Sequence, residues 1–351
     1  MQKKINKNKE YDMLKLFERY IRESRSGTRL KPNLTKISDG TIKQYVNCYK
    51  RLQLFATEKS FPLRIRDIKR LGKREMKAEK KYWSSFYSQF TDYLYQEKNC
   101  HDNYVGHLIK NIRSFLNYLS KEKQIQTTEI SKLMYVPHEH VPIITISPKQ
   151  LKFLRSDRQF EEGLNKTQRL VKDIFVVGCS VGLRISDLNN LHPRHLLETE
   201  NGTYLSLYTQ KTKTPVKIKL ANHVVEIIKR RRRHNRLLPK LSLKYFNAYL
   251  KEIAEKAGWT HEVIKTRSKR GVGKSNRRDS TDLLRFCDLI SSHTMRRTTV
   301  TNLLMMGMPE NLVRKISGHT PGSKEFHRYV EFTQTYVDLE VEKANQKMDA
   351  Y

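Results

Sequence analysis

The sequence lacks the residues that would suggest a metal site, a disulfide framework or a membrane segment. Its 351 residues include only four cysteines, which lie far apart with no pair at metal-binding spacing. No stretch approaches the ~20 consecutive apolar residues of a membrane span, and no apolar N-terminal segment resembles a signal peptide. We therefore expect a protein of the reducing cytoplasm that uses no metal or cofactor and has no membrane contact.

Acidic residues are also few. The chain has 36 Asp and Glu against 69 Lys and Arg, a formal net charge of +33 that is spread along its length. Such a charge favours a polyanion as partner. The carboxylates form no cluster of the kind that holds two metal ions in a nuclease, so any chemistry on a polyanion must come from other side chains.

Length and periodicity predict two folded domains, since a domain usually has about 100–200 residues. Residues 1–35 are basic and end in a stretch that contains Ser, Gly and Pro, so we assign them to an N-terminal arm or linker. Residues 36–124 contain three apolar stripes at helical spacing, as in a compact helical domain. We assign their aromatic residues to the core and not to base stacking. The stripes are Ile42, Tyr45, Val46, Tyr49, Leu52 and Phe55; Trp83, Phe86, Phe90 and Leu94; and Leu108, Ile112, Phe115, Leu116 and Leu119.

The second domain follows an extended linker at residues 125–146, where helical periodicity lapses. Ser147-Pro148-Lys149-Gln150 then forms a capping box with proline in the first helical turn, so we place this domain over residues 147–351. Two alternating segments, Tyr204–Tyr208 and Val216–Leu220, predict a pair of strands in an otherwise mostly helical domain. The predicted fold class is mainly α, with a small antiparallel β-sheet in the second domain.

Six polar residues of the second domain form an ordered set. Taken singly, each could be an ordinary surface residue. The members of the His-x-x-Arg pair share a helical face and could equally form a salt-bridged helix start. The six are Arg184 in Gly-Leu-Arg, Lys211 between the two strands, His293 and Arg296 in His-Thr-Met-Arg, His319 in Ser-Gly-His, and Tyr329 ten residues further on.

In this order the six residues resemble the signature of the tyrosine recombinase (phage integrase) family, over about residues 147–345. The phrase SGHTPGSKEF is similar to integrases of Bacteroides-type mobile elements. The resemblance implies a helical core-binding domain at 36–124, a catalytic domain at 147–351, and site-specific DNA recombination that integrates or excises a mobile element. It implies that all six residues are catalytic. Lys213 is the alternative to Lys211, and Tyr336 is the alternative to Tyr329, because ten residues separate Tyr329 from His319 where the family often has nine.

The chemistry of strand exchange explains these residue types. Arg184 and Arg296 can stabilise the extra negative charge of a pentavalent phosphate with forked donors that stay protonated. His293 can accept the phenol proton or donate to the phosphate, and His319 can hydrogen-bond the same group. The resemblance implies that Lys211 protonates the leaving 5′-oxygen. Tyr329 would form a 3′-phosphotyrosine that stores the energy of the broken bond, so that rejoining needs neither ATP nor metal.

The same resemblance implies double-stranded DNA as the partner, a homotetramer on two DNA sites, and possible accessory DNA-bending proteins. The N-terminal arm either binds separate DNA sites or is a solvated tail. A basic segment at residues 261–280 is predicted to be a loop that faces DNA, or one that is merely solvated. The candidate DNA contacts are Lys213, Lys265, Arg267, Lys269, Arg270 and Lys274.

Two other functions remain compatible with a basic chain of this kind. A type IB topoisomerase would relax supercoils without joining two sites. A catalytically silent DNA-binding or architectural protein would keep the fold but lose one or more of the six residues, and all six are present.

Overall fold

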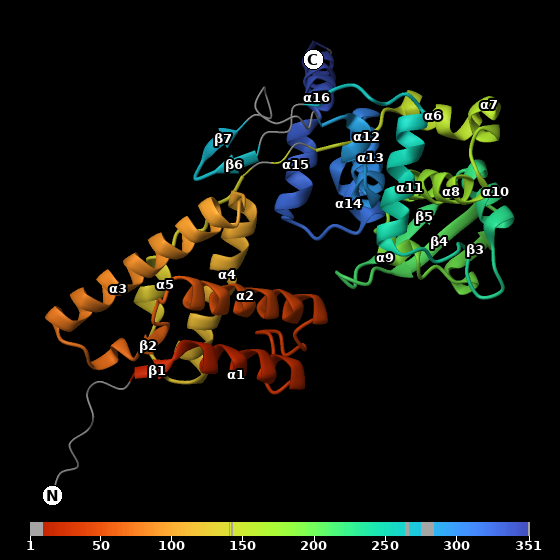
Figure 1. Cartoon of the computed structure of the whole chain (residues 1–351). Coiled ribbons are helices and arrows are strands. Elements are labelled where there is room, and N and C mark those ends of the chain that lie inside the picture. Colours follow the sequence, from red (N-terminus) through yellow and green to blue (C-terminus); the bar gives the residue numbers. More distant parts are fainter. Residues whose placement is uncertain (1–9, 140, 142, 264–266, 275–283, 350–351) are drawn as a thin grey trace, which may run out of the picture. The chain divides into compact units, whose positions relative to one another are not determined.

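The computed structural model describes residues 10–139, 141, 143–263, 267–274 and 284–349, which fall into two compact units (Figure 1). Unit 1 comprises residues 1–141 and 266–275, and unit 2 comprises residues 142–265 and 276–351. Helices dominate both units, and the strands of the described part form three small antiparallel sheets. The predicted fold class is confirmed. No helix among the described residues is long and apolar enough to cross a membrane.

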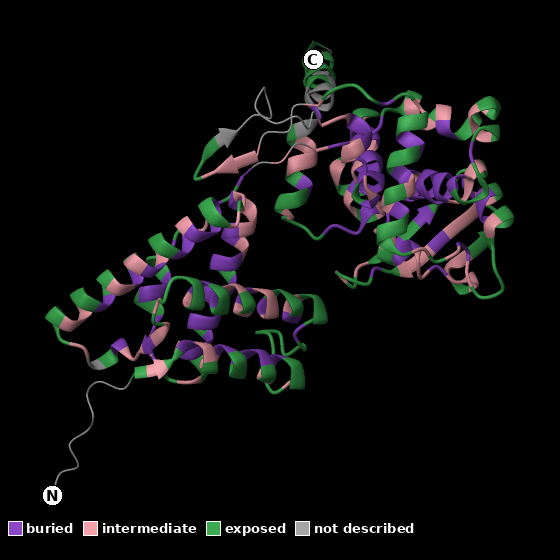
Figure 2. Cartoon of the chain, in the orientation of Figure 1, coloured by how far each residue is buried: buried purple, intermediate pink, exposed green. Residues whose placement is uncertain are grey.

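The apolar stripes of the first domain form the long helices of unit 1. These are α2 (Asp39–Glu58), α3 (Lys73–Asp92) and α4 (Asp102–Glu122). The aromatic residues of the stripes are buried except for Tyr49, which is half-buried and packs against the same core, and Figure 2 shows the buried positions along the helices. The assignment of these rings to the core is confirmed. Unit 1 also contains a short strand, β2 (Arg64–Arg66), and three short helices, η1 (Ile68–Arg70), η2 (Tyr93–Glu97) and α5 (Thr128–Lys132).

The assignment of residues 1–35 to an arm or linker is wrong for the part that the structure describes. Residues Met13–Ser26 form helix α1, which Asp12 caps and Gly27 ends with a φ of +84°. Met13, Phe17 and Tyr20 are fully buried in the core of unit 1. The preceding strand β1 (Glu10–Asp12) pairs with β2. Residues 1–9 lie outside the described part.

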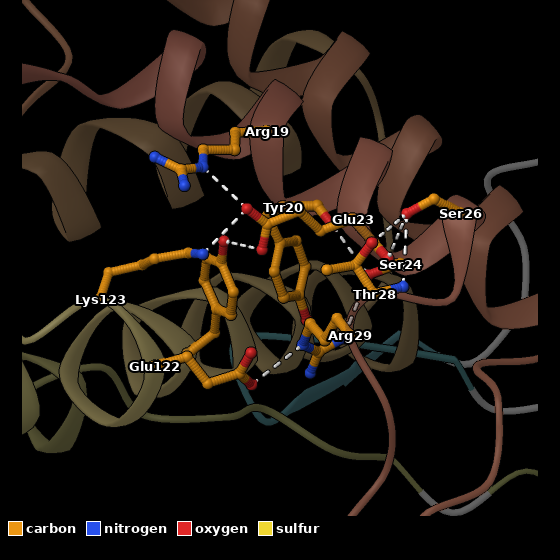
Figure 3. Close-up of polar contacts among 10 residues, drawn as sticks. Arg19, Tyr20, Glu23, Ser24, Ser26, Thr28, Arg29, Glu122 and Lys123 are labelled. Carbon is orange, nitrogen blue, oxygen red and sulfur yellow. Dashed lines mark hydrogen bonds and ion pairs between the residues drawn. The ribbon is translucent and has the colours of Figure 1, made fainter.

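A network of polar side chains ties α1 to α4 (Figure 3). The Glu23 carboxylate accepts hydrogen bonds from Arg19 Nε at 2.7 Å, Lys123 Nζ at 2.8 Å and Tyr118 Oη at 2.6 Å. Burial alone would raise the pKa of Glu23, but these three donors lower it to about 2. Arg29, just after α1, lies over the Tyr20 ring at 4.4 Å. The basic residues near α1 are therefore partly committed to packing within the protein.

Unit 2 is built around α8 (Lys166–Val181), a helix with eleven buried residues. Helix α13 (Ser292–Met305) packs directly on it, since a Cβ on Gly178 of α8 would lie 2.2 Å from Met295 Sδ. The predicted start of α6 is confirmed: Ser147 and Gln150 form a reciprocal capping box. The remaining helices are α6 (Pro148–Ser156), α7 (Arg158–Glu162), α9 (Ile185–Leu188), η3 (Pro193–His195), α10 (Asn222–Arg231), α11 (Leu243–Lys256), α12 (Phe286–Leu289), α14 (Glu310–Ser317), α15 (Lys324–Phe332) and α16 (Gln334–Asp349).

The sheet of unit 2 has one strand more than the sequence analysis predicted. Strands β4 (Gly202–Tyr208) and β5 (Pro215–Lys219) pair as expected, with Tyr208 opposite Pro215. A third strand, β3 (Leu196–Thr199), pairs with the other edge of β4. Three of its four residues are exposed and the fourth is half-buried, so it has no alternating apolar pattern by which it could have been recognised.

The basic segment near residue 270 forms a hairpin of unit 1 and not an open loop. Strand β6 (Arg267–Lys269) pairs with β7 (Val272–Lys274). Arg267 makes an ion pair with Glu139 at 2.8 Å, and Arg270 with Asp92. Lys265 and the side chain of Lys274 lie outside the described part. The expectation of a loop is therefore wrong for the described residues, in which Arg267 and Arg270 pair with carboxylates and Lys269 donates to Asn99 Oδ1.

Candidate active site

Five of the six predicted catalytic residues line one pocket of about 230 Å³ in unit 2, at the ends of α8, α13 and α15. They are Arg184, Lys211, His293, Arg296 and Tyr329. The sixth, His319, contacts the Tyr329 ring with a centroid distance of 5.8 Å. The sequence analysis did not single out four other lining residues, Ile143, Arg297, Glu325 and Arg328. Arg297 follows Arg296 directly, and Glu325 and Arg328 lie within four residues of Tyr329, so proximity in sequence was the available signal.

Arg184 follows a sharp end of helix α8. Gly182 takes up a φ of +68° there, and a Cβ at this position would lie 3.1 Å from Thr299 Cγ2. Glycine therefore provides both the left-handed turn and the close approach of α13. Arg184 stands at the start of α9 with extended backbone. The turn directs the chain so that the Arg184 side chain lines the pocket.

Two backbone carbonyls hold the Arg296 guanidinium in place. Its Nη1 donates to the oxygen of Gly182 at 3.2 Å and to that of Ser317. The side chain is only 5% exposed, and burial, followed by the charge of Arg184, lowers its pKa to about 10. The residue therefore remains a cation at neutral pH.

Each of the two arginines presents a nitrogen that lacks a partner. Among the described residues, neither Arg184 Nη1 nor Arg296 Nη2 has a hydrogen-bond acceptor, although both atoms are buried. A buried cationic donor without an acceptor is unfavourable. The pocket is thus suited to an anion with several oxygens, such as a phosphate.

Lys211 lies in the turn between β4 and β5, which is anchored to α9 and to the end of α14. Asp187 of α9, 1% exposed, accepts a hydrogen bond from the backbone nitrogen of Gln210 at 2.8 Å. Thr212 Oγ1 donates to the Gly318 carbonyl at 3.3 Å. Lys213 is exposed at a φ of +54°. Among the described lining residues of the pocket, Lys211 is present and Lys213 is not.

His319 is held by a serine two residues before it. Ser317 Oγ donates to the Val313 carbonyl at 2.7 Å, which engages its only proton. The same oxygen lies 2.8 Å from His319 Nδ1 and must accept a proton from it. This geometry assigns the proton of neutral His319 to Nδ1 and leaves Nε2 as an acceptor. Burial, with the charges of Arg296 and Arg184, lowers the pKa of His319 to about 3.

His293 stands at the solvent side of the pocket, on the first turn of α13. Desolvation at the pocket wall, followed by the charges of Arg297 and Arg184, lowers its pKa below the ordinary value. Both histidines of the site are therefore neutral near pH 7, and each has a ring nitrogen that can accept a hydrogen bond.

Tyr329 is anchored through its own helix. Phe326, three residues earlier on α15, is fully buried against α13 and α14, and its ring lies 5.3 Å from that of His319. Tyr329 packs beside this small core and lines the pocket. Tyr336 lies in α16, and its side chain is outside the described part.

Unit 1 has a separate basic pocket of about 880 Å³, between the α1–α2 connection and α4. Arg29 lies at its edge, paired with Glu122 at 3.5 Å (Figure 3). The other four cations of the pocket have no carboxylate partner among the described residues; they are Lys31, Lys110, Arg113 and Lys121. Ser114 and Asn117 add polar groups. The pocket is suited to phosphate contacts, and stripe periodicity in the sequence could not reveal it.

Comparison with known proteins identifies one family. The sequence profile of the phage integrase family matches residues 161–336, half of the chain. A comparison of the sequence with curated proteins finds no match. The fold is similar to that of lambda integrase in a dimer bound to a COC′ core site, with 13% identity, a TM-score of 0.59, and coverage of 91% of this chain and 77% of that chain. It is also similar to the Tn1549 transposon integrase in complex with transposon right end DNA, with 15% identity, a TM-score of 0.59, and coverage of 95% and 100%. A lambda integrase tetramer bound to a Holliday junction gives 12% identity, a TM-score of 0.58, and coverage of 93% and 79%.

Proposed function

This chain belongs to the phage integrase family of tyrosine-type enzymes, which cleave and rejoin DNA in site-specific recombination, and we propose that Tyr329 is its nucleophile. The observation that carries the proposal is the pocket in which Tyr329 lies beside two arginines, each with a buried donor that has no acceptor in the described part of the chain. A scissile phosphate in this pocket would meet both donors. We assign Arg184 and Arg296 the role of holding its non-bridging oxygens during attack.

The reaction exchanges one phosphodiester for another. Tyr329 Oη attacks phosphorus, the bond from phosphorus to the 5′-oxygen breaks, and the product is a 3′-phosphotyrosine with a free 5′-hydroxyl. We assign the phenol proton to His293, and we assign His319, which stays neutral, the role of hydrogen-bonding the reacting group. Lys211 gives a proton to the leaving 5′-oxygen, and its position in the pocket lining supports it over Lys213. Attack by a second 5′-hydroxyl reverses these steps.

The partners follow from the same proposal. We infer that the chain acts on double-stranded DNA as a homotetramer on two sites, with accessory DNA-bending proteins, to integrate or excise a mobile element of the Bacteroides type in the cytoplasm. We assign 36–124 to core binding and 147–351 to catalysis. In unit 1, we propose that Lys110 and Arg113 contact DNA phosphates through the basic pocket. Lys213, exposed on the turn of unit 2, is the corresponding candidate there.

The test is a covalent adduct. The protein is incubated in EDTA with a duplex from the junctions of the element that encodes it, nicked near the crossover, and adducts stable to SDS are mapped by mass spectrometry. We expect a phosphotyrosine on Tyr329 that is absent in Tyr329→Phe and present in Tyr336→Phe. An adduct on Tyr336 would refute the assignment of the nucleophile. Tight binding without any adduct would indicate a silent DNA-binding protein, and relaxation of supercoils without joining of two sites would indicate a topoisomerase.

A further inference from the structure

The β6–β7 hairpin belongs to unit 1 although its sequence lies between Lys211 and His293 of unit 2. The chain therefore passes between the units three times: at residues 141–142, 265–266 and 275–276. The hairpin does not contribute to the pocket that contains Tyr329 among the residues described for it. Its role in the protein is thus separate from the chemistry.

The turn of the hairpin is bound by a buried carboxylate. Arg270 and Gly271 have φ angles of +56° and +74°, the values of a tight turn that matches the twist of two strands. Asp102, at the first position of α4, is 1% exposed. Its two oxygens accept from the backbone nitrogen of Arg270 at 2.8 Å and of Gly271 at 3.0 Å, and Tyr95 Oη donates at 2.6 Å. Without the hairpin, Asp102 would keep only Tyr95 among these three donors.

A second buried carboxylate binds strand β6. Glu139 is 3% exposed, and its carboxylate accepts from Arg267 Nε at 3.0 Å and from the backbone nitrogen of Ser268. The backbone of Glu139 is itself fixed by Asn103 of α4, at 3.0 and 3.2 Å. Burial by itself would raise the pKa of Glu139, but Arg267 and Ser268 leave it below the ordinary value. The Glu139 carboxylate is therefore charged, and α4 holds its backbone in the position from which it binds this strand.

Further contacts surround these two. Lys269 donates to Asn99 Oδ1, Arg270 pairs with Asp92, and the Arg270 guanidinium lies 5.4 Å from the Tyr95 ring centre. In a chain of net charge +33, Asp92, Asp102 and Glu139 thus form an acidic site that complements a basic hairpin. A buried carboxylate without donors is costly, so unit 1 favours the docked hairpin.

We propose that Asp102 and Glu139 form a docking site for the β6–β7 hairpin of the same chain, and that the docked hairpin is an intramolecular clasp that prolongs the binding of DNA. The clasp adds two covalent passages between the units to the single linker. When both units bind one duplex, each bound unit raises the effective concentration of the other unit at the DNA. The protein leaves the DNA only when both units dissociate. Arg267 and Arg270 then serve the clasp and not DNA phosphates. The DNA part of this inference rests on the proposed function; the docking does not.

A charge swap tests the clasp with the full-length protein. The variants are Arg267→Glu, Glu139→Arg and the two combined, with Glu129→Arg, at an exposed position of α5, as a matched control. Hydrogen exchange without DNA measures the hairpin amides of Ser268, Arg270 and Gly271. We expect each single variant to accelerate their exchange by about tenfold or more, the double variant to restore protection, and the α4 amides to be unchanged in all.

The second measurement is the dissociation rate of a fluorescent nonspecific duplex, in a Tyr329→Phe background that removes covalent capture. We expect the single variants to dissociate about tenfold faster and the double variant to match the parent. Unprotected hairpin amides in the parent would overturn the docking. Rapid DNA release that the double variant fails to restore would make Arg267 a DNA contact and overturn the clasp, as would undocking with no change in DNA release.

Because both readouts are independent of covalent chemistry, a failure of the clasp is distinguishable from a failure of the Tyr329 assignment.

Discussion

Ser317 Oγ lies 2.8 Å from His319 Nδ1 while its own proton is donated to the Val313 carbonyl. The serine therefore determines which ring nitrogen of the histidine carries the proton. Because the Ser317 carbonyl also accepts from Arg296, one residue positions two members of the site. This relationship depends on the end of α14, where Gly318 turns the chain with a φ of +62°.

Replacing Ser317 with alanine should remove the preference of His319 for the tautomer that carries its proton on Nδ1. We expect Ser317→Ala to slow strand cleavage by about 10–100-fold, the range seen when a group that orients a metal-ligating histidine is lost. Nitrogen NMR of the wild-type protein should show His319 protonated at Nδ1, and the variant should show a shift toward Nε2. Ser180→Ala is the matched control, since Ser180 donates to Val176 and contacts His223 Nε2 at 3.1 Å away from the pocket. Unchanged cleavage and an unchanged tautomer in Ser317→Ala would refute this role.

Stability should fall on mild acidification. The folded protein lowers the pKa of His319 to about 3 and also lowers that of His293, whereas an unfolded histidine has a pKa of about 6.5. Below pH ~6.5 the unfolded chain binds more protons than the folded one, so the stabilisation is complete above that pH and is lost as the pH falls toward 3. Thermal unfolding measured from pH 8 to pH 5 should follow this trend. His319→Gln should flatten this trend, and an unchanged slope in that variant would refute the contribution of His319.

Glycine at position 318 should be required for both conformation and space. A Cβ on Gly318 would lie 3.0 Å from Thr209 Cγ2, whereas a Cβ on Gly322, at φ +69°, meets nothing within 4 Å. Each change to alanine incurs a left-handed strain of about 1–2 kcal/mol, and Gly318→Ala adds displacement of Thr209 at the base of the Lys211 turn. We expect Gly318→Ala to lower stability more than Gly322→Ala and to slow cleavage, as measured by denaturant unfolding and single-turnover assays. Equal effects of the two variants would contradict this account.

The Glu23 network should stabilise unit 1. Glu23→Gln removes the charge that accepts from Arg19, Lys123 and Tyr118, and we expect a loss of about 1–2 kcal/mol in unfolding free energy. Glu129→Gln, which breaks an exposed pair with Lys132, should change stability by less than about 1 kcal/mol. Denaturant unfolding at neutral pH measures both. A loss no larger than that of the control would show that α1 is held by its apolar residues alone.

The basic pocket of unit 1 should contribute to the salt dependence of DNA binding. Lys110→Ala and Arg113→Ala should each weaken binding uniformly across sequences and reduce the slope of log affinity against log salt by about one. Lys132→Ala, an exposed lysine paired with Glu129, is the control and should leave the slope unchanged. Fluorescence anisotropy at several salt concentrations makes the comparison. An unaltered slope in the pocket variants would exclude phosphate contacts there.

Local pattern was sufficient for much of this protein. The three apolar stripes of α2, α3 and α4 could be recognised because helical spacing alone directs those residues to one side. The capping box at Ser147 needed only adjacent residues. The ordered set from Arg184 to Tyr329 was recognisable through its resemblance to a family signature, and phosphate chemistry explains the residue types of that signature. Helix α1 had the same apolar spacing, but its surrounding lysines and arginines led to its assignment as an arm.

Tertiary structure decided which charges are free. Nothing local distinguishes Arg267, which is paired with a carboxylate 128 residues away, from Lys211, which lines the pocket. The two arginine nitrogens that have no acceptor among the described residues, and the lowered pKa of His319, likewise depend on burial by distant segments. Secondary structure and the identity of the reactive groups arise from interactions between near neighbours, which the sequence determines by itself. Burial, ion pairing and proton position arise from groups far apart in the chain, and these only the folded structure brings together.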